Sequence, residues 1–413
     1  MKKRLIGLLA AALTLLVGFA AAEEADTLTS GDWEYRMLEN GTAEVTAYNN
    51  IINGMDPIEI PIPDELDGIT VSSIESNPFC IYDATAFTVS PDHPYFEVVD
   101  GVLFSKADKR LIAYPLMKEA TAYTIPDGTE IIGESAFCFC ENLSSITIPD
   151  SVKKIGDSAF FYCTELTSIR IPEGVTSISE SMLYGCSALA SVILPDSLTS
   201  IGPLAFFLCC NLTSLHIPDS VTSIDHNPFY GCDQLVLSLS ADHPTLEIVD
   251  DVLFSKTDKR LIRYPIMKNN TVYTVPEGTQ IIGTFAFSDC ETLTRITLPN
   301  SVTSIEFRAF TCCTALTDIN IPEGVTNIED ETFADCFALT SISLPDSVTS
   351  IGSGAFNCCS MLTNLSIPDC VTYIGRAAFS DCSNLTLTVG HHTYAAQYAE
   401  ENNIPYAFPA SDS

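Results

Sequence analysis

Sixteen cysteines are the side chains of this 413-residue sequence with the most potential chemistry. Such a number in an exported chain is typical of a disulfide framework. Ten of them, however, recur at one position of a 23-residue repeat: Cys140, Cys163, Cys186, Cys209, Cys232, Cys290, Cys313, Cys336, Cys359 and Cys382. A small thiol suits a buried slot in which it satisfies loop backbone groups. We expect free structural thiols in this column, with disulfides between stacked cysteines as the alternative. A zinc site is not expected, because parallel columns do not bring four ligands to one point.

The six cysteines outside this column are Cys80, Cys138, Cys210, Cys312, Cys358 and Cys370. Only Cys80 and Cys138 share a position on adjacent repeats, and each follows a repeated phenylalanine. Equivalent Cα atoms on adjacent strands lie about 4.8 Å apart, within the roughly 4.4–6.8 Å that a disulfide spans. Alternation along the chain should turn both side chains off the core. This pair is therefore the predicted exception among otherwise reduced cysteines.

The six histidines and the acidic pairs form no recognisable catalytic or metal-binding motif. The sequence contains no His-Glu-x-x-His, no Gly-x-Ser-x-Gly elbow and no phosphate-binding glycine loop. His93 and His243 occupy equivalent positions in a duplicated Asp-His-Pro, which favours a loop role. The pair Asp250-Asp251 could bind calcium weakly, but it lacks the ordered spacing of calcium loops and is typical of a solvated surface. The sequence predicts a nonenzymatic protein with no catalytic residue, no metal and no cofactor.

The charge balance limits the class of partner. Acidic residues number 53 against 19 basic ones, which gives a formal net charge of −34. Nucleic acid and anionic membranes would be repelled by such a field. The hydrophobic content of 46% is too high for a disordered chain and allows a large buried core. We expect a protein or another cell-surface macromolecule as partner.

The amino-terminal residues have the pattern of an export signal. A basic start through Arg4, an apolar run from Leu5 to Phe19 and three alanines before Glu23 predict a signal peptide over residues 1–22. A retained membrane anchor is the alternative, although it needs about 20 apolar residues. The first cysteine after the run is Cys80, so no lipoprotein-type anchor is encoded there. We expect a secreted or noncovalently surface-associated protein without membrane insertion after signal removal.

A 23-residue internal repeat predicts the architecture. Each unit has the pattern Leu-x-x-Ile-x-Ile-Pro, followed by Val-x-x-Ile and Ala-Phe-x-x-Cys. Its aromatic column is Phe137, Phe160, Leu183, Phe206, Phe229, Phe287, Phe310, Phe333, Phe356 and Phe379, and its leucine column runs from Leu143 to Leu385. The Leu-x-x-Ile-x-Ile stretch predicts a strand that the proline ends, Val-x-x-Ile a second extended piece, and Ala-Phe-x-x-Cys a tight helical turn. Since one unit cannot bury its own side chains, the units should stack into a solenoid with buried columns.

A longer duplicated module interrupts the repeats. Residues 89–137 and 239–287 match at an offset of 150, with 32 identities in 49 positions, which indicates recent duplication. Within the first copy, Glu97 to Pro115 predicts two strands around Ala107-Asp108-Lys109. We therefore expect two lengthened turns with projecting hairpins, at about 89–125 and 239–275.

The two ends of the chain should close the stack, because a bare terminal turn would expose its core. The residues around Glu39-Asn40-Gly41 predict a capping hairpin over 31–48. Tyr394 to Asn403 predicts a short helix, followed by a closing strand at Ile404 to Tyr406. The predicted organisation is an amino-terminal cap over 23–57, a solenoid over 58–389 and a carboxyl-terminal cap over 390–413.

The repeat pattern, the opening Gly31-Asp32-Trp33-Glu34-Tyr35 and the segment Gly101-Val102-Leu103-Phe104 resemble the bacterial leucine-rich-repeat surface proteins called BspA-like. The resemblance covers nearly all of the mature chain. It implies a mainly β leucine-rich-repeat solenoid with short helical turns, capped at both ends. Some members of that family are adhesins that bind host extracellular-matrix proteins or other bacteria. Many carry a surface-anchoring segment, which is not evident here.

Outward-facing strand positions are the candidate binding residues. They form small polar rows, from which we select Arg170 and His216 in the first half and Arg295, Asp318 and Asn320 in the second. Such rows fit a broad, shallow protein-binding face and equally fit plain solvation. They contain no Trp or Tyr cluster of the kind found at protein hot spots. We expect a protein that mediates protein–protein interaction, including adhesion; a cell-envelope scaffold or spacer without a host ligand is the alternative.

Overall fold

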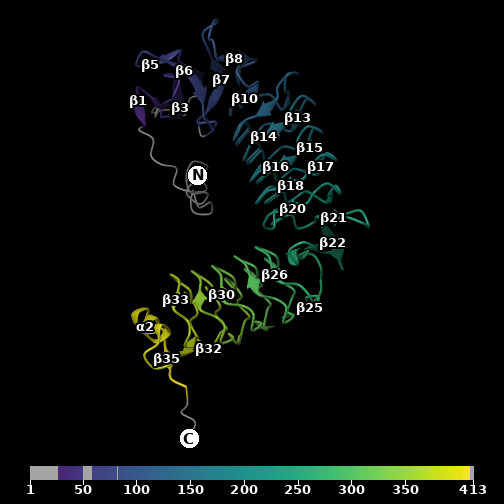
Figure 1. Cartoon of the computed structure of the whole chain (residues 1–413), viewed down its shortest axis with the longest axis vertical. Helices are drawn as coiled ribbons and strands as arrows, with labels where there is room; N and C mark the ends of the chain where they lie inside the picture. Colours follow the sequence, from purple (N-terminus) through teal and green to yellow (C-terminus); the bar gives the residue numbers. More distant parts are fainter. Residues whose placement is uncertain (1–26, 50–57, 81, 410–413) are drawn as a thin grey trace.

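The computed structural model describes residues 27–49, 58–80 and 82–409. Figure 1 shows stacked turns that form an open arc, with the capping strands at one end and a helix at the other. The predicted leucine-rich-repeat solenoid is confirmed. The predicted signal peptide, residues 23–26 and 50–57 of the predicted amino-terminal cap and the last four residues lie outside the described part of the chain.

The Leu-x-x-Ile stretches form the first row of short strands, which follows the outer edge of the arc in Figure 1. Its strands are β4 (Ile58–Pro61), β7 (Ala84–Thr88), β11 (Ala122–Thr124), β13 (Ser145–Thr147), β15 (Ser168–Arg170), β17 (Ser191–Ile193), β19 (Ser214–His216), β21 (Val236–Ser238), β25 (Val272–Thr274), β27 (Arg295–Thr297), β29 (Asp318–Ile319), β32 (Asn364–Ser366), β34 (Thr386–Thr388) and β35 (Tyr406–Ala407). The row is divided into several sheets, and within each sheet neighbouring strands pair in parallel, as Ile169 does with Val192.

The Val-x-x-Ile stretches form the second row, along the inner edge of the arc (Figure 1). Its strands are β12 (Ile131–Ile132), β14 (Lys154–Ile155), β16 (Ser177–Ile178), β18 (Ser200–Ile201), β20 (Ser223–Ile224), β26 (Ile281–Ile282), β28 (Ser304–Ile305), β30 (Asn327–Ile328), β31 (Ser350–Ile351) and β33 (Tyr373–Ile374). These strands are also parallel, as in the pairing of Ile178 with Ile201. The hydrophobic core lies between the two rows.

The predicted apolar columns are buried. Every residue of the aromatic column and of the leucine column is at most 5% exposed. Successive rings stack face to face, with 5.4 Å between the centroids of Phe310 and Phe333. Tyr114 and Tyr264 extend the aromatic column into the lengthened turns, where they stack on the next phenylalanine. The stacking prediction is confirmed, because each ring shares its cavity walls with its neighbours.

The Ala-Phe-x-x-Cys segments are tight turns, and the predicted helical conformation is wrong. The amides of Ser135, Phe137 and Phe139 donate to carbonyls of the next repeat at 2.7–2.9 Å. Ser135 and Phe139 have φ angles of +54° and +58°, in the left-handed region. A helix needs its amides for bonds four residues back and a right-handed backbone throughout. Each turn instead uses alternate amides to bind the next turn.

The column cysteines link adjacent turns without a covalent bond. Eight of the ten thiols donate to a backbone carbonyl 26 residues earlier, at 2.9–3.2 Å, which belongs to the aromatic-column residue of the preceding turn. Cys140 and Cys290 follow the lengthened turns, where this position is Tyr114 or Tyr264. All sixteen cysteines are free in the structure. The thiols therefore have the backbone-satisfying role expected of the column.

Each duplicated module forms three antiparallel strands rather than the two predicted. The first comprises β8 (Phe96–Val99), β9 (Val102–Ser105) and β10 (Arg110–Ala113), and the second β22 (Leu246–Val249), β23 (Val252–Ser255) and β24 (Arg260–Arg263). β10 and β24 continue into the second row by parallel pairing with β12 and β26. The additional strand appears because a two-residue turn at Asp100-Gly101, with φ of +51° and +76°, reverses the chain.

The acidic pair of the second module occupies the equivalent turn. Asp250 and Asp251 both have positive φ angles. Lys268 Nζ lies 2.8 Å from Asp250 Oδ1 and 3.4 Å from Asp251 Oδ2, and it also donates to the Asp250 carbonyl at 2.6 Å. The pair is therefore engaged by an ammonium group that holds the turn.

Both ends of the stack carry covering elements. At the amino terminus, β1 (Leu28–Ser30), β2 (Trp33–Met37), β3 (Ala43–Tyr48), β5 (Glu65–Leu66) and β6 (Ile69–Ile74) form one sheet in which β2 and β3 are the hairpin. At the carboxyl end, α2 (Tyr394–Glu401) covers the last turn, and β35 pairs with β34. Thr393 caps α2 by accepting the Ala396 amide at 3.3 Å. The precise division at residues 57 and 389 stays a prediction.

Candidate interaction surface

Arg170 and His216 end strands of the first row and point to solvent. Arg170 Nη1 lies 2.9 Å from Asp150 Oδ1, and His216 Nδ1 lies 3.1 Å from Ser238 Oγ. Ile193 stands between them in the row and is 59% exposed. The two predicted residues are thus two turns apart on one surface, with an apolar side chain between them.

Arg295 and Asp318 form an exposed ion pair in the second half. Their strands β27 and β29 pair in register, which places Arg295 Nε 2.9 Å from Asp318 Oδ2. Exposed pairs of this kind contribute little to stability, since both ions lose hydration and side-chain freedom. The two charges partly neutralise each other, so a ligand would meet them as one polar unit.

Asn320 is engaged in the fold itself. Its amide nitrogen donates to the Leu298 carbonyl at 2.8 Å, and its amide oxygen accepts the Leu298 amide at 2.9 Å. The Asn320 side chain thereby makes with the Leu298 backbone the two hydrogen bonds that the backbone of a neighbouring strand would make. The structure does not bring the five predicted residues together, because the second module separates Arg170 and His216 from Arg295, Asp318 and Asn320.

The two duplicated histidines have the loop role that their equivalence suggests. His93 and His243 are each 1% exposed. In both, Nδ1 accepts the amides two and three residues further on, at 3.1–3.3 Å. A neutral ring is needed for this acceptor role. Burial lowers the pKa of His93, and nearby Asp64 only partly opposes that effect.

The residues that strand-based reasoning missed form an aromatic ladder at one corner of the turns. This corner ladder comprises Phe139, Phe161, Tyr162, Tyr184, Phe207, Tyr230, Phe285 and Phe307. Four of the eight residues, Phe161, Tyr184, Phe207 and Tyr230, directly follow the aromatic column at a 23-residue spacing, and that spacing was the available signal. Five of them are half-buried rather than covered: Phe139, Tyr162, Phe207, Tyr230 and Phe307.

The corner ladder is continuous from the first half of the chain across the junction to Phe285 and Phe307 of the second half. Ring centroids lie 4.7 Å apart for Tyr184 and Phe207, and 4.9 Å apart for Tyr230 and Phe285, which come from different halves. The Arg308 guanidinium lies over the Phe307 ring at 5.0 Å. Burial raises the pKa of Tyr184 to about 12, so its hydroxyl stays protonated. Half-exposed Tyr, Phe and Arg groups are the usual composition of protein-binding hot spots.

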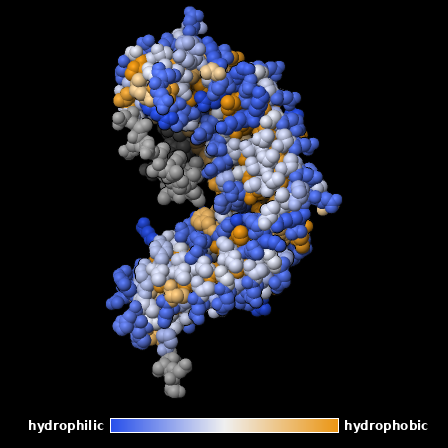
Figure 2. All heavy atoms as spheres, in the orientation of Figure 1, coloured by the Kyte–Doolittle hydropathy of each residue, from blue (hydrophilic) through white to orange (hydrophobic). Residues whose placement is uncertain are grey.

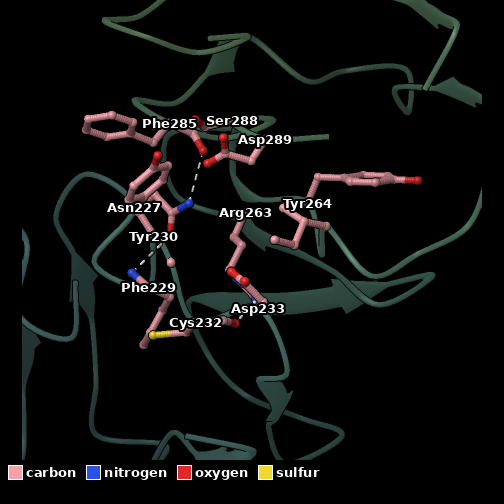
Figure 3. Close-up of a pocket in the computed structure, with 12 residues that line it drawn as sticks. Asn227, Phe229, Tyr230, Cys232, Asp233, Arg263, Tyr264, Phe285, Ser288 and Asp289 are labelled. Atoms are coloured by element: carbon pink, nitrogen blue, oxygen red, sulfur yellow. Dashed lines mark hydrogen bonds between the residues drawn. The ribbon is translucent and has the colours of Figure 1, made fainter. Parts of the chain in front are cut away.

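A small cavity lies where the two halves meet (Figure 3). Arg263 lines it and is 5% exposed, and its guanidinium donates to the Cys232 and Leu235 carbonyls at 2.9 and 3.2 Å. Burial lowers the pKa of Arg263. The equivalent residue of the first module is Ala113. The cavity volume of about 10 Å³ suits a single water molecule, so this site stabilises the junction rather than binding an organic ligand.

The face of the molecule shown in Figure 2 is mostly polar. Figure 2 shows hydrophilic and intermediate residues over most of the visible face, with small, separate hydrophobic patches. Exposed apolar side chains at the first row include Ile193, Val236 and Val272. In the part of the chain that the structure describes, we find no helix of the length and apolarity that a bilayer crossing requires.

Comparison with known proteins now identifies the repeat. The family model described as "BspA type Leucine rich repeat region" matches in six copies, over residues 116–236 and 267–386, which is more than half of the chain. The chain belongs to the BspA-type leucine-rich-repeat family. The match begins after the three antiparallel strands of the first module and resumes after those of the second, so the BspA-type repeats are the regular turns of the stack.

Two solved structures are similar to this BspA-type chain over almost its whole length. A leucine-rich cell surface protein from Faecalibacterium prausnitzii A2-165 is 32% identical, with 93% of this chain and 99% of that chain covered and a TM-score of 0.63. The pneumococcal vaccine antigen PcpA is 19% identical, with 94% and 100% covered and a TM-score of 0.59. The second likeness concerns the fold alone. None of the curated proteins compared with this BspA-type chain matches it.

Proposed function

We propose that this BspA-type protein is a secreted or surface-associated nonenzymatic protein that binds another macromolecule, including host matrix proteins or the surfaces of other cells. The corner ladder carries this proposal. It presents partly exposed Tyr and Phe rings, with Arg308 at one end, in a continuous strip that crosses the junction of the two halves. Aromatic and arginine side chains contribute most of the binding energy at protein interfaces.

The location is proposed on two grounds. Residues 1–22 have the pattern of a signal peptide, and the similar protein from Faecalibacterium prausnitzii is named a cell surface protein. The ten column thiols have a role in packing, and the duplicated histidines hold loops. Both sets of side chains therefore have structural roles that need no catalytic function. Binding without turnover fits these roles.

The first row supplies a second part of the proposed surface. Arg170, His216 and the Arg295–Asp318 pair project from it, and they give polar contacts beside exposed Ile193. A partner that binds along the length of the solenoid would contact one such side chain on each successive turn. The net charge of −34 favours a partner with a basic surface.

A binding experiment with three classes of target tests the proposal. Purified protein is mixed with immobilised matrix proteins, with mucin and with envelope of the producing cell, and retained protein is quantified. Saturable binding to matrix proteins or mucin supports the adhesin function. Binding to envelope alone would support the alternative, a scaffold or spacer. Hydrolysis of peptide, glycan or ester substrates that a single substitution abolishes would contradict the nonenzymatic proposal.

A further inference from the structure

The two junctions between the lengthened turns and the regular repeats are built alike. In the first, Asn77 Nδ2 donates to the Ser135 carbonyl at 2.8 Å, and in the second Asn227 Nδ2 donates to the Phe285 carbonyl at 3.1 Å (Figure 3). In each, the asparagine oxygen also accepts the amide two residues further on. In both halves, therefore, the same asparagine contacts join two segments that lie 58 residues apart in the sequence.

The residues that follow the buried phenylalanines differ between these junctions. The first has Cys80 and Cys138, whereas the second has Tyr230 and Ser288 at the positions offset by 150. Cys138 is 6% exposed and packs with Phe161 and Tyr184 at the start of the corner ladder. Cys80 is more accessible and packs against the same cluster. The Cys80 and Cys138 thiols lie in one cluster, close enough for each to shift the pKa of the other.

We propose that Cys80 and Cys138 form a disulfide that fastens the turn before β7 to the first regular repeat. The inference rests on the proposed export, because disulfides persist in oxidising compartments. Equivalent residues of adjacent turns lie within the Cα separation that a disulfide spans. Column thiols such as Cys163 donate to backbone carbonyls instead, so their oxidation would sacrifice those bonds.

The oxidant is the disulfide of an extracytoplasmic thiol–disulfide oxidoreductase. Cys80 reacts first, since it is the more accessible thiol and its contact with Cys138 lowers its pKa, while the same contact and burial raise the pKa of Cys138. The Cys80 thiolate attacks one oxidoreductase sulfur and releases the other as a thiolate. Cys138 then loses its proton and attacks Cys80 Sγ, which releases the second oxidoreductase sulfur. Two protein thiols are oxidised and one oxidoreductase disulfide is reduced.

The test uses the purified protein treated with oxidised glutathione, alkylated in denaturant and analysed by mass spectrometry. We expect loss of two of the sixteen alkylation sites and one cross-linked peptide pair that contains Cys80 and Cys138. Cys80→Ala and Cys138→Ala should each abolish the cross-link, whereas the column variant Cys359→Ala should retain it. Circular dichroism of each variant confirms folding.

Stability and location give separate controls. Reductant should lower the thermal midpoint of the oxidised protein by several degrees and leave that of Cys138→Ala unchanged. Alkylation of all sixteen cysteines after oxidation would overturn the proposal, as would cross-links confined to the column, such as Cys359 with Cys382. Because no binding partner enters this experiment, its failure is distinguishable from failure of the proposed binding function.

Discussion

The Cys186 thiol donates a hydrogen bond to the Phe160 carbonyl, 3.1 Å away on the preceding turn. That carbonyl also accepts the Cys163 amide at 3.1 Å, so one oxygen joins two repeats. Repetition of this arrangement explains why a thiol recurs at this position without needing a disulfide. It also makes the column a source of stability.

Replacement of one column thiol should therefore weaken the stack. Cys186→Ala removes a buried hydrogen bond and leaves a small void, so we expect a loss of about 1–3 kcal/mol in the free energy of unfolding. Urea denaturation followed by circular dichroism measures it. Cys210→Ala is the matched control, because Cys210 is exposed and lies outside the column; an equal loss in both variants would contradict the role of the column.

Removal of one stacked ring should cost more. Phe310 is fully buried between Phe287 and Phe333, at centroid distances of 5.3 and 5.4 Å. We expect Phe310→Ala to destabilise the protein by about 3–5 kcal/mol, since it leaves a cavity in a shared column. Phe337→Ala, at a position that is 44% exposed, should change the same denaturation midpoint little. Similar midpoints for the two variants would be incompatible with the stacked core.

The stability of the first module should depend on pH through His93. Its folded-state pKa lies below the ordinary value of 6.5, because burial favours the neutral ring that accepts the Tyr95 and Phe96 amides. Below that ordinary value the unfolded chain binds a proton that the folded chain does not, so this stability contribution falls as pH decreases through and below 6.5.

Denaturant midpoints of the wild-type protein and His93→Gln between pH 8 and pH 5 measure this dependence. The advantage of the wild-type protein over His93→Gln should shrink toward pH 5. An advantage that stays constant over this range would refute a neutral, acceptor His93.

The buried guanidinium at the junction of the halves should stabilise the second module. Arg263→Ala restores the residue found at position 113 of the first copy, but it leaves the Cys232 and Leu235 carbonyls without their charged donor. We expect a loss of about 2–3 kcal/mol in the free energy of unfolding. Arg170→Ala, at the exposed pair with Asp150, should cost less than about 1 kcal/mol. Equal costs in thermal denaturation would show that Arg263 is not needed at the junction.

The repeat period predicted the core better than the corners. Phe310 and its equivalents were assigned correctly, because a 23-residue period places one residue of each turn at the same point of the stack. The conformation around Ser135 was not predictable from local pattern, since its amide bonds to Asp157 of the next turn. The conformational preferences of neighbouring residues contain no information about hydrogen bonds between turns.

The candidate surface was likewise predicted correctly where the sequence pattern fixes side-chain direction, and missed where contacts between turns decide it. Arg170 and Asp318 were placed on the outward face by strand alternation, and the structure has both exposed there. The corner ladder was missed because Tyr184 and Phe207 lie outside the strands, where alternation says nothing about direction. The bonds of Asn320 to Leu298 depend on the neighbouring strand and had no local signal.

The central claim is that the corner ladder is the binding surface. The most direct test of it is the affinity of ladder variants for whichever matrix protein or mucin binds the protein in the experiment above. Tyr162→Ser and Phe307→Ser remove half-exposed rings of the corner ladder, while Tyr373→Ser removes a ring that is 52% exposed on the second row. By surface plasmon resonance, each ladder variant should raise Kd at least about tenfold, the effect of losing roughly 1.4 kcal/mol of binding energy. Tyr373→Ser should leave Kd within about twofold. Unchanged affinity of both folded ladder variants, or a loss confined to Tyr373→Ser, would contradict the corner ladder as the binding surface.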